Sequence, residues 1–187
     1  MSKRELILES MTTLIAEQGI QGTPMSQIAK ASGVATGTIY HHFTSKEEII
    51  NAIYLEKKKD FQAVIQRAMA SKENYRDQFM EIWKGLFDYY LDNPSVLLFT
   101  LQVGATPIIT PEIRTEGLRY YQIIIDYFKK GQTQKLIKQL DALLIAEMVH
   151  ANIIKLAELK LRNKALIGSS EIAAAVSYCW DGVSYVK

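Results

Sequence analysis

The sequence predicts an all-α fold, on the basis of two observations. Apolar residues recur at spacings of three and four along most of the 187 residues, which is the period of helices with one buried face. No stretch shows the sustained alternation of apolar and polar residues that a half-buried strand requires. Glycine, proline, serine and threonine separate the apolar segments, and they mark the expected ends of the helices.

Three helices are expected in the first quarter of the chain. The first covers residues 3–18, whose apolar residues share one face. The second begins after Thr23, because a threonine side chain can accept a bond from a free helix amide. It ends at Gly33, since glycine readily adopts the left-handed conformation of a helix terminus. The third helix turns Ile39 and Phe43, four residues apart, toward the core.

The other faces of this third helix are polar. Its hydroxyl, phenol and imidazole side chains belong to Thr36, Thr38, Tyr40, His41 and His42. In a helix-turn-helix, the second helix enters the major groove, and neighbouring side chains contact phosphates. A short polar helix that follows a glycine turn therefore predicts a DNA-binding unit.

The segment from Gln27 to Glu47 resembles the signature of the tetracycline-repressor (TetR) family of transcriptional regulators, with a mild departure at Ser32. The resemblance covers about a quarter of the chain once the preceding helix is included. It implies phosphate contacts from Thr23, Thr36, Tyr40 and Lys46. It also implies contacts with the groove or the DNA backbone from Gly37, Thr38, His41 and His42.

Some of these residues also have a purely structural interpretation. Tyr40 could cover the edge of the core, and Ser45 with Glu48 forms the pattern of a capping box that starts the next helix. The formal net charge is only +2, so non-specific attraction to DNA is expected to be modest. Lys3 and Arg4 either add cationic contacts or belong to a disordered tail.

Further helices are expected at residues 46–69, 74–92, 111–131, 141–162 and from 169 onward, with a short buried helix and a loop between 93 and 111. No low-complexity linker separates the parts. We expect an N-terminal three-helix helix-turn-helix DNA-binding head at residues 1–48. A C-terminal helical bundle at residues 49–187 is expected to bind a ligand and to form the dimer.

The last two helices predict a homodimer through residues 141–163 and 169–187. Apolar residues cover more than one face of the first segment, so one face is left for a partner. Ala173, Ala174 and Ala175 allow close approach in the second segment. A two-fold dimer would present two recognition helices to a pseudo-palindromic operator. The alternative is a monomer whose own bundle covers these faces.

A cavity between the helices of the body is the expected site of a small, largely apolar or aromatic effector. Its candidate residues are Trp83, Phe87, Tyr90, Phe99, Tyr121, Ile124, Tyr127, Phe128, Met148 and His150. Such an aromatic stripe is more often an ordinary core. His150 with Glu147 resembles half of a metal site, but the interpretation as a hydrogen-bonded interior or interface residue is preferred.

No catalytic motif, cofactor motif or metal motif is recognisable. The single cysteine, Cys179, excludes an intramolecular disulfide and fits a reducing compartment. We expect no signal peptide, no membrane span and a cytoplasmic location. The predicted function is a DNA-binding regulator, a homodimeric repressor released by an effector. The alternatives are an effector-independent DNA-binding regulator, and a helical carrier or enzyme that uses the bundle cavity.

Overall fold

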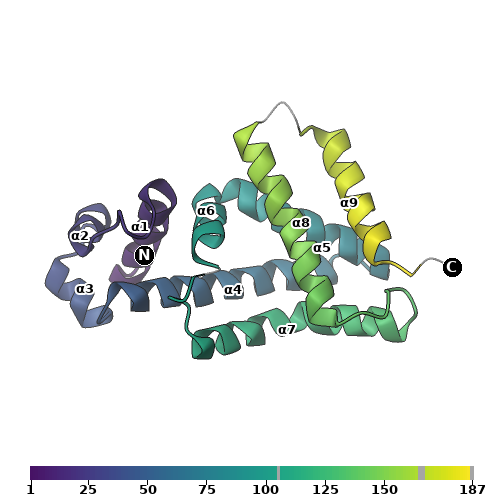
Figure 1. Cartoon of the computed structure of the whole chain (residues 1–187), viewed down its shortest axis with the longest axis horizontal. Helices are drawn as coiled ribbons and strands as arrows, with labels where there is room; N and C mark the ends of the chain where they lie inside the picture. The colour runs from purple at the N-terminus through teal and green to yellow at the C-terminus, as the bar shows by residue number, and fades with distance from the viewer. Residues whose placement is uncertain (105, 164–166, 186–187) are drawn as a thin grey trace. The chain divides into compact units, whose positions relative to one another are not determined.

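The computed structural model describes residues 1–104, 106–163 and 167–185, and these residues form helices joined by loops (Figure 1). The chain divides into two compact units. The first consists of Met1–Lys59 and Asn93–Arg119, and the second of Asp60–Asp92 and Tyr120–Lys187. Two long helices, α4 (Lys46–Ala70) and α7 (Pro111–Thr133), contribute residues to both units.

The first unit contains the helices α1 (Lys3–Gln18), α2 (Met25–Ser32), α3 (Thr36–His42) and α6 (Pro94–Val103). A capping box between Ser2 and Glu5 starts α1, so the chain is helical from Lys3 onward rather than a disordered tail. Arg4 Nη1 donates to Glu56 Oε1 at 2.6 Å, and this ion pair joins α1 to α4.

Helix α6 packs against α1 inside this unit. Phe99, Val103 and Ile109 belong to the same apolar core as the head residues Ile7, Met11, Ile28, Ile39 and Phe43. The loop after α6 is fixed by Arg114, whose guanidinium donates to the carbonyls of Gly104, Thr106 and Ile109 at 2.8–3.2 Å. The compact unit around the helix-turn-helix therefore includes α6 and this loop.

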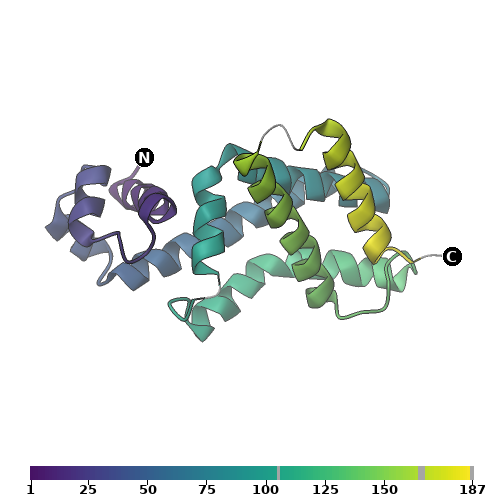
Figure 2. The same cartoon turned by 45° about the horizontal axis from the view of Figure 1, so that its top comes forward.

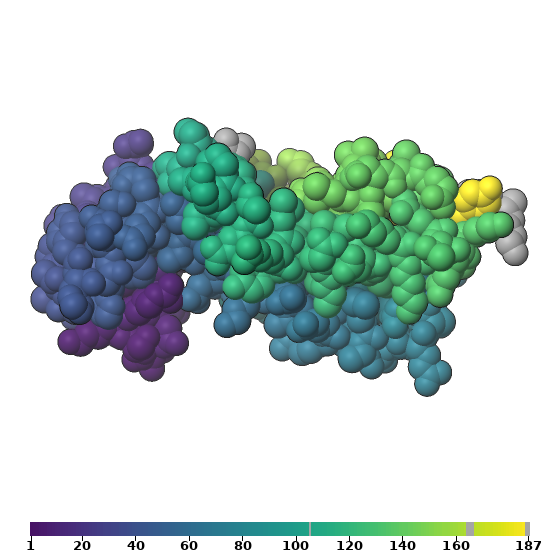
Figure 3. All heavy atoms as spheres, turned by 90° about the horizontal axis from the view of Figure 1, so that it is seen from below, coloured from purple at the N-terminus to yellow at the C-terminus, as the bar shows by residue number. Residues whose placement is uncertain are grey.

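The second unit contains α5 (Tyr75–Asp92), α8 (Ala142–Arg162) and α9 (Ser169–Val183). Helix α5 contacts both α8 and α9, and Figures 1 and 2 show the latter two side by side. The second half of α7 covers one face of this unit (Figure 3). Tyr75 and Tyr127 join α5 to α7, since each phenol donates to the other residue's carbonyl, at 2.9 and 2.7 Å.

The all-α prediction is confirmed, and the helix bounds match closely. One difference is the end of α7, which continues to Thr133 instead of stopping at Gly131. Gly131 is buried inside the helix against Tyr75, so it is a packing position rather than a cap. Within the described residues, none of the helices is long and apolar enough to cross a membrane. The functional boundary at residue 48 stays a prediction.

Candidate nucleic-acid interface

The turn between α2 and α3 has the expected geometry. Gly33 has φ 65° and ψ 15°, the left-handed conformation that glycine adopts most easily. Val34 is buried next to it. The hydroxyl of Ser32 donates to the carbonyl of Ile28 at 2.7 Å and accepts from the amide of Val34 at 3.3 Å. The departure from the family pattern at Ser32 therefore supplies hydrogen bonds that hold the turn.

Helix α3 turns one apolar face inward and a polar surface outward. Ile39 and Phe43 are 0% and 3% exposed, whereas Tyr40 is 51% exposed. The candidate contact residues on this helix that are exposed or half-buried are Thr36, Gly37, Thr38, His41 and His42. Because Tyr40 does not cover the core edge, its phenol is accessible for a contact outside the chain.

Gly37 lies in the first turn of α3 without a structural requirement for glycine. A Cβ atom built there meets no other atom of the described chain within 4 Å. Its backbone does not adopt the left-handed conformation that disfavours other residues. The open space beside Gly37 lets another molecule approach the backbone of this helix closely.

Two candidate contacts are engaged within the protein. Thr23 is fully buried, and its hydroxyl donates to the carbonyl of Gly19 at 2.9 Å. It does not cap α2, whose N-cap residue Pro24 has no side-chain bond. Lys46 Nζ donates to the carbonyl of Ile20 at 3.0 Å. Thr23 and Lys46 thus hold the turn between α1 and α2, and in this structure Thr23 is closed to DNA.

The helix after the motif starts with one of the two bonds of the predicted capping box. Ser45 Oγ accepts from the amide of Glu48 at 3.1 Å, and the Glu48 carboxylate accepts from the amide and hydroxyl of Thr44. These bonds to Thr44 favour the ionised carboxylate and lower the pKa of Glu48. The carboxylate reaches the amide of Thr44 rather than that of Ser45, so the reciprocal half of the box is replaced by a bond one residue earlier, and together these bonds fix the entry into α4 directly after the recognition helix.

In the second unit, the structure brings together most of the candidate effector residues. Tyr90 Oη lies 2.9 Å from His150 Nε2, and the ring of Tyr121 lies 6.2 Å from that imidazole. Trp83 stacks on Phe87 at 5.2 Å. Ile124, Tyr127 and Phe128 are also buried in this unit. The interpretation of His150 as a hydrogen-bonded interior residue is confirmed.

Two candidates are not part of this cluster. Phe99 belongs to the core of the first unit, and Met148 is 56% exposed on the outer face of α8. Phe61 was not among the predicted residues, although its ring lies 5.5 Å from His150. Asn152 was not predicted either, and its Oδ1 accepts from Trp83 Nε1 at 3.1 Å. The inward position of Phe61 was recognisable, but nothing in the sequence pairs Asn152 with Trp83.

The single cysteine is not available for covalent chemistry. Cys179 is a free, buried thiol. Its pKa is raised to about 11 because burial disfavours the charged thiolate. A thiol with such a pKa is a poor nucleophile at neutral pH.

A helix-turn-helix with an exposed second helix, joined to a helical body, defines the class of DNA-binding transcriptional regulators. A model of the bacterial regulatory proteins of the tetR family matches residues 2–53. A model of the tetracyclin repressor-like C-terminal domain matches residues 74–184. The chain belongs to the TetR family.

Related sequences and solved structures agree with this assignment. The chain is 26% identical to an HTH-type transcriptional regulator of Haemophilus influenzae over 103 residues, 55% of each chain. It is 30% identical to the regulator UidR of Escherichia coli K12 over 122 residues, 64% of this chain and 54% of UidR. The chain thus spans about half the length of these relatives.

Two crystal structures share the whole fold. A TetR-family regulator from Marinobacter aquaeolei VT8 superposes with a TM-score of 0.90 at 22% identity, over 98% of this chain and 96% of that chain. The regulator FadR of Bacillus subtilis, in complex with stearoyl-CoA, superposes with a TM-score of 0.75 at 22% identity, over 95% of both chains. At this identity, the likeness concerns the fold.

Proposed function

We propose that this regulator is a homodimeric repressor that binds a pseudo-palindromic operator and is released by a small effector. The observation that carries the proposal is the outward polar surface of α3, above the buried Ile39 and Phe43. Thr36, Gly37 and Thr38 at its start have short side chains or none, so base readout there depends on thymine methyl groups and DNA shape rather than on long bidentate side chains. Such a regulator acts in the cytoplasm, where the chromosome lies, and performs no enzymatic reaction.

Exposed apolar side chains support the dimer. Leu144 and Met148, one turn apart on α8, are 50% and 56% exposed, and Tyr178 on α9 is 77% exposed. The exposed Ala173 and Ala174 leave room for a neighbouring helix. Apolar faces of this kind mark interaction sites in proteins. Residues 186–187, which end the predicted dimer segment, lie outside the described residues.

The buried aromatic cluster of the second unit supports an apolar or aromatic effector. It supplies a hydrophobic wall with few polar groups, Tyr90, His150 and Asn152 among them, as ligand sites do. The stearoyl-CoA bound in the FadR structure is a ligand with a long apolar part, in a protein of the same fold. Effector and DNA would favour different conformations, so each weakens binding of the other by the same factor.

The direct test is selection of bound sequences from random duplexes, followed by affinity measurements on the most strongly enriched sequence. A repressor dimer enriches a palindrome with half-sites about one helical turn, roughly 34 Å, apart. Tyr40→Phe and Lys46→Ala should each weaken binding several-fold. Enrichment of no palindrome would favour the carrier or enzyme. An enriched palindrome whose binding no metabolite alters would favour the effector-independent regulator.

A further inference from the structure

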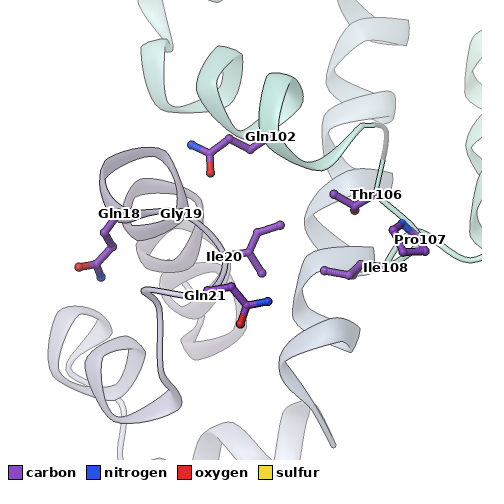
Figure 4. A pocket seen from close by; sticks show the side chains of 8 residues that line it. All are labelled: Gln18, Gly19, Ile20, Gln21, Gln102, Thr106, Pro107 and Ile108. Carbon is purple, nitrogen blue, oxygen red and sulfur yellow. The ribbon is translucent and has the colours of Figure 1, made fainter.

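A pocket of about 570 Å³ lies within the first compact unit (Figure 4). Ile20 and Gln21, from the turn after α1, form part of its wall. Gln102 of α6 and the loop residues Thr106, Pro107 and Ile108 form another part of the wall. Its volume falls within the range of about 300–1,000 Å³ that is usual for small-molecule sites.

The chemistry of the wall selects an uncharged molecule. Ile20, Pro107 and Ile108 supply apolar surface, while Gln21 and Gln102 supply amides that can both donate and accept hydrogen bonds. Among the described residues that line the pocket, none carries a charge. A charged ligand would gain no ionic partner from these residues, whereas a neutral ligand can meet both the apolar surface and the amides.

The walls are fixed by hydrogen bonds that do not involve a ligand. Arg114 holds the loop on one side through three carbonyls, including that of Thr106. On the other side, Gly19 ends α1 with φ 77°, and its carbonyl accepts from the buried Thr23. The pocket is therefore preformed, which is the usual condition of small-molecule sites.

One wall of the pocket is connected to the DNA-binding head. The carbonyl of Ile20, whose side chain faces the pocket in Figure 4, accepts the hydrogen bond from Lys46 Nζ. Lys46 is also the residue for which we predict a phosphate contact. A molecule that stabilises Ile20 in its present position also stabilises the conformation in which Lys46 is held within the protein.

We propose that this pocket binds a small uncharged molecule with an apolar body and an amide, carbonyl or hydroxyl group, and that its occupation weakens DNA binding. The binding does not depend on the effector site of the second unit. The effect on DNA rests on the predicted phosphate contact of Lys46, because DNA competes with Ile20 for that ammonium group. By linkage, bound DNA weakens the binding of the small molecule by the same factor.

The first experiment uses N-methylbenzamide as a neutral probe and sodium benzoate as a charged probe of similar size. NMR spectra of the nitrogen-labelled protein are recorded during both titrations. We expect saturable shifts of the backbone amides of Ile20 and Gln21 and of the side-chain amide of Gln102. Benzoate should bind at least about tenfold more weakly. Shifts centred on other residues, or equal binding of benzoate, would overturn the site.

Two variants locate the binding. Ile108→Trp fills the pocket and should abolish probe binding. The control Leu118→Trp adds the same side chain at a position that is 43% exposed and does not line the pocket, and binding should persist. Because the bulky change at Ile108 could disturb folding, Gln102→Leu removes only the amide and should weaken the probe about fivefold. Unchanged binding in both pocket variants would reject the site.

The link to DNA is tested on a selected operator. The saturating probe should weaken operator binding of the unaltered protein about fivefold or more, as coupled sites do. The same addition should have no effect on Lys46→Met. If the probe occupies the pocket and operator affinity does not change, the linkage is wrong although the site stands. If Lys46→Met binds the operator with the same affinity as the unaltered protein, the predicted phosphate contact of Lys46 is wrong.

Discussion

The hydroxyl of Tyr90 on α5 lies 2.9 Å from Nε2 of His150 on α8, and both side chains are buried. Their rings are nearly parallel, with centroids 6.0 Å apart and an interplanar angle of 21°. The ring of Phe61 on α4 lies 5.5 Å from each. This polar pair therefore joins two helices of the second unit at a point where a third also packs.

Tyr90→Phe removes the hydroxyl and keeps the ring. The buried imidazole loses this hydrogen bond, so we expect the free energy of unfolding to fall by about 1–2 kcal/mol. Urea unfolding measures the change. Tyr40→Phe is the control, because Tyr40 is 51% exposed on α3, outside the proposed dimer helices, and its phenol is accessible to water in the DNA-free protein. An equal loss in both variants would show that the bond to His150 contributes nothing.

The helices were predictable because each one carries its own local signals. Asp141 caps α8 by accepting from the amide of Leu144, and Asn74 accepts from the amide of Asp77 at the start of α5. Ser45 accepts from the amide of Glu48 at the start of α4, as expected. Such bonds join residues three positions apart, so a sequence displays them directly.

Long-range roles were not predictable in the same way. Phe99 has an aromatic side chain of the kind that lines ligand sites, but its helix α6 packs in the core of the first unit. The position of Thr23 predicts a cap of α2, yet its hydroxyl donates to the carbonyl of Gly19. Lys46 reaches Ile20, 26 positions earlier. These choices depend on which helices meet, and hydrophobic periodicity does not encode that.

Gly37 provides a test that separates folding from DNA binding. Since an added Cβ meets no atom of the described chain within 4 Å, Gly37→Ala should not disturb the packing. Alanine is the better helix former, so stability should stay equal or rise by up to about 1 kcal/mol. Operator affinity should nevertheless fall, about fivefold or more, because the methyl group keeps the DNA backbone away. Unchanged affinity, measured by fluorescence anisotropy, would contradict the predicted contact.

The proposed dimer predicts that one substitution halves the mass of the particle in solution. Met148→Glu places a charge on the outer face of α8, where a partner helix would bury it without an ion pair. We expect sedimentation analysis to show monomers at concentrations where the unaltered protein is dimeric. Leu118→Glu, at another exposed leucine, should leave the dimer intact. A dimer that persists in Met148→Glu would place the interface elsewhere.

The capping carboxylate of Glu48 predicts a pH dependence. The hydrogen bonds from Thr44 lower the pKa of Glu48 in the folded protein, because they favour the ionised carboxylate. The ionised side chain therefore stabilises the folded state relative to the unfolded state. That stabilisation is complete above the ordinary glutamate pKa and is lost as the pH falls through the lowered value. Glu48→Gln should therefore melt below the unaltered protein at pH 7. The difference should shrink steadily in acid, whereas Glu47→Gln should show little difference at either pH.

The packing of α7 against α5 predicts opposite effects at two helical glycines. A Cβ on Gly131 would lie 2.3 Å from Tyr75 Oη, and that phenol is held by its bond to the carbonyl of Tyr127. Gly131→Ala should therefore cost about 1–3 kcal/mol of unfolding free energy, as overpacking of a core does. At Gly182, nothing of the described chain lies within 4 Å of an added Cβ. Gly182→Ala should be neutral or stabilising by up to about 1 kcal/mol. Equal stability of the two variants in urea would mean that Tyr75 can move aside, and that its reciprocal bonds with Tyr127 do not fix the two helices.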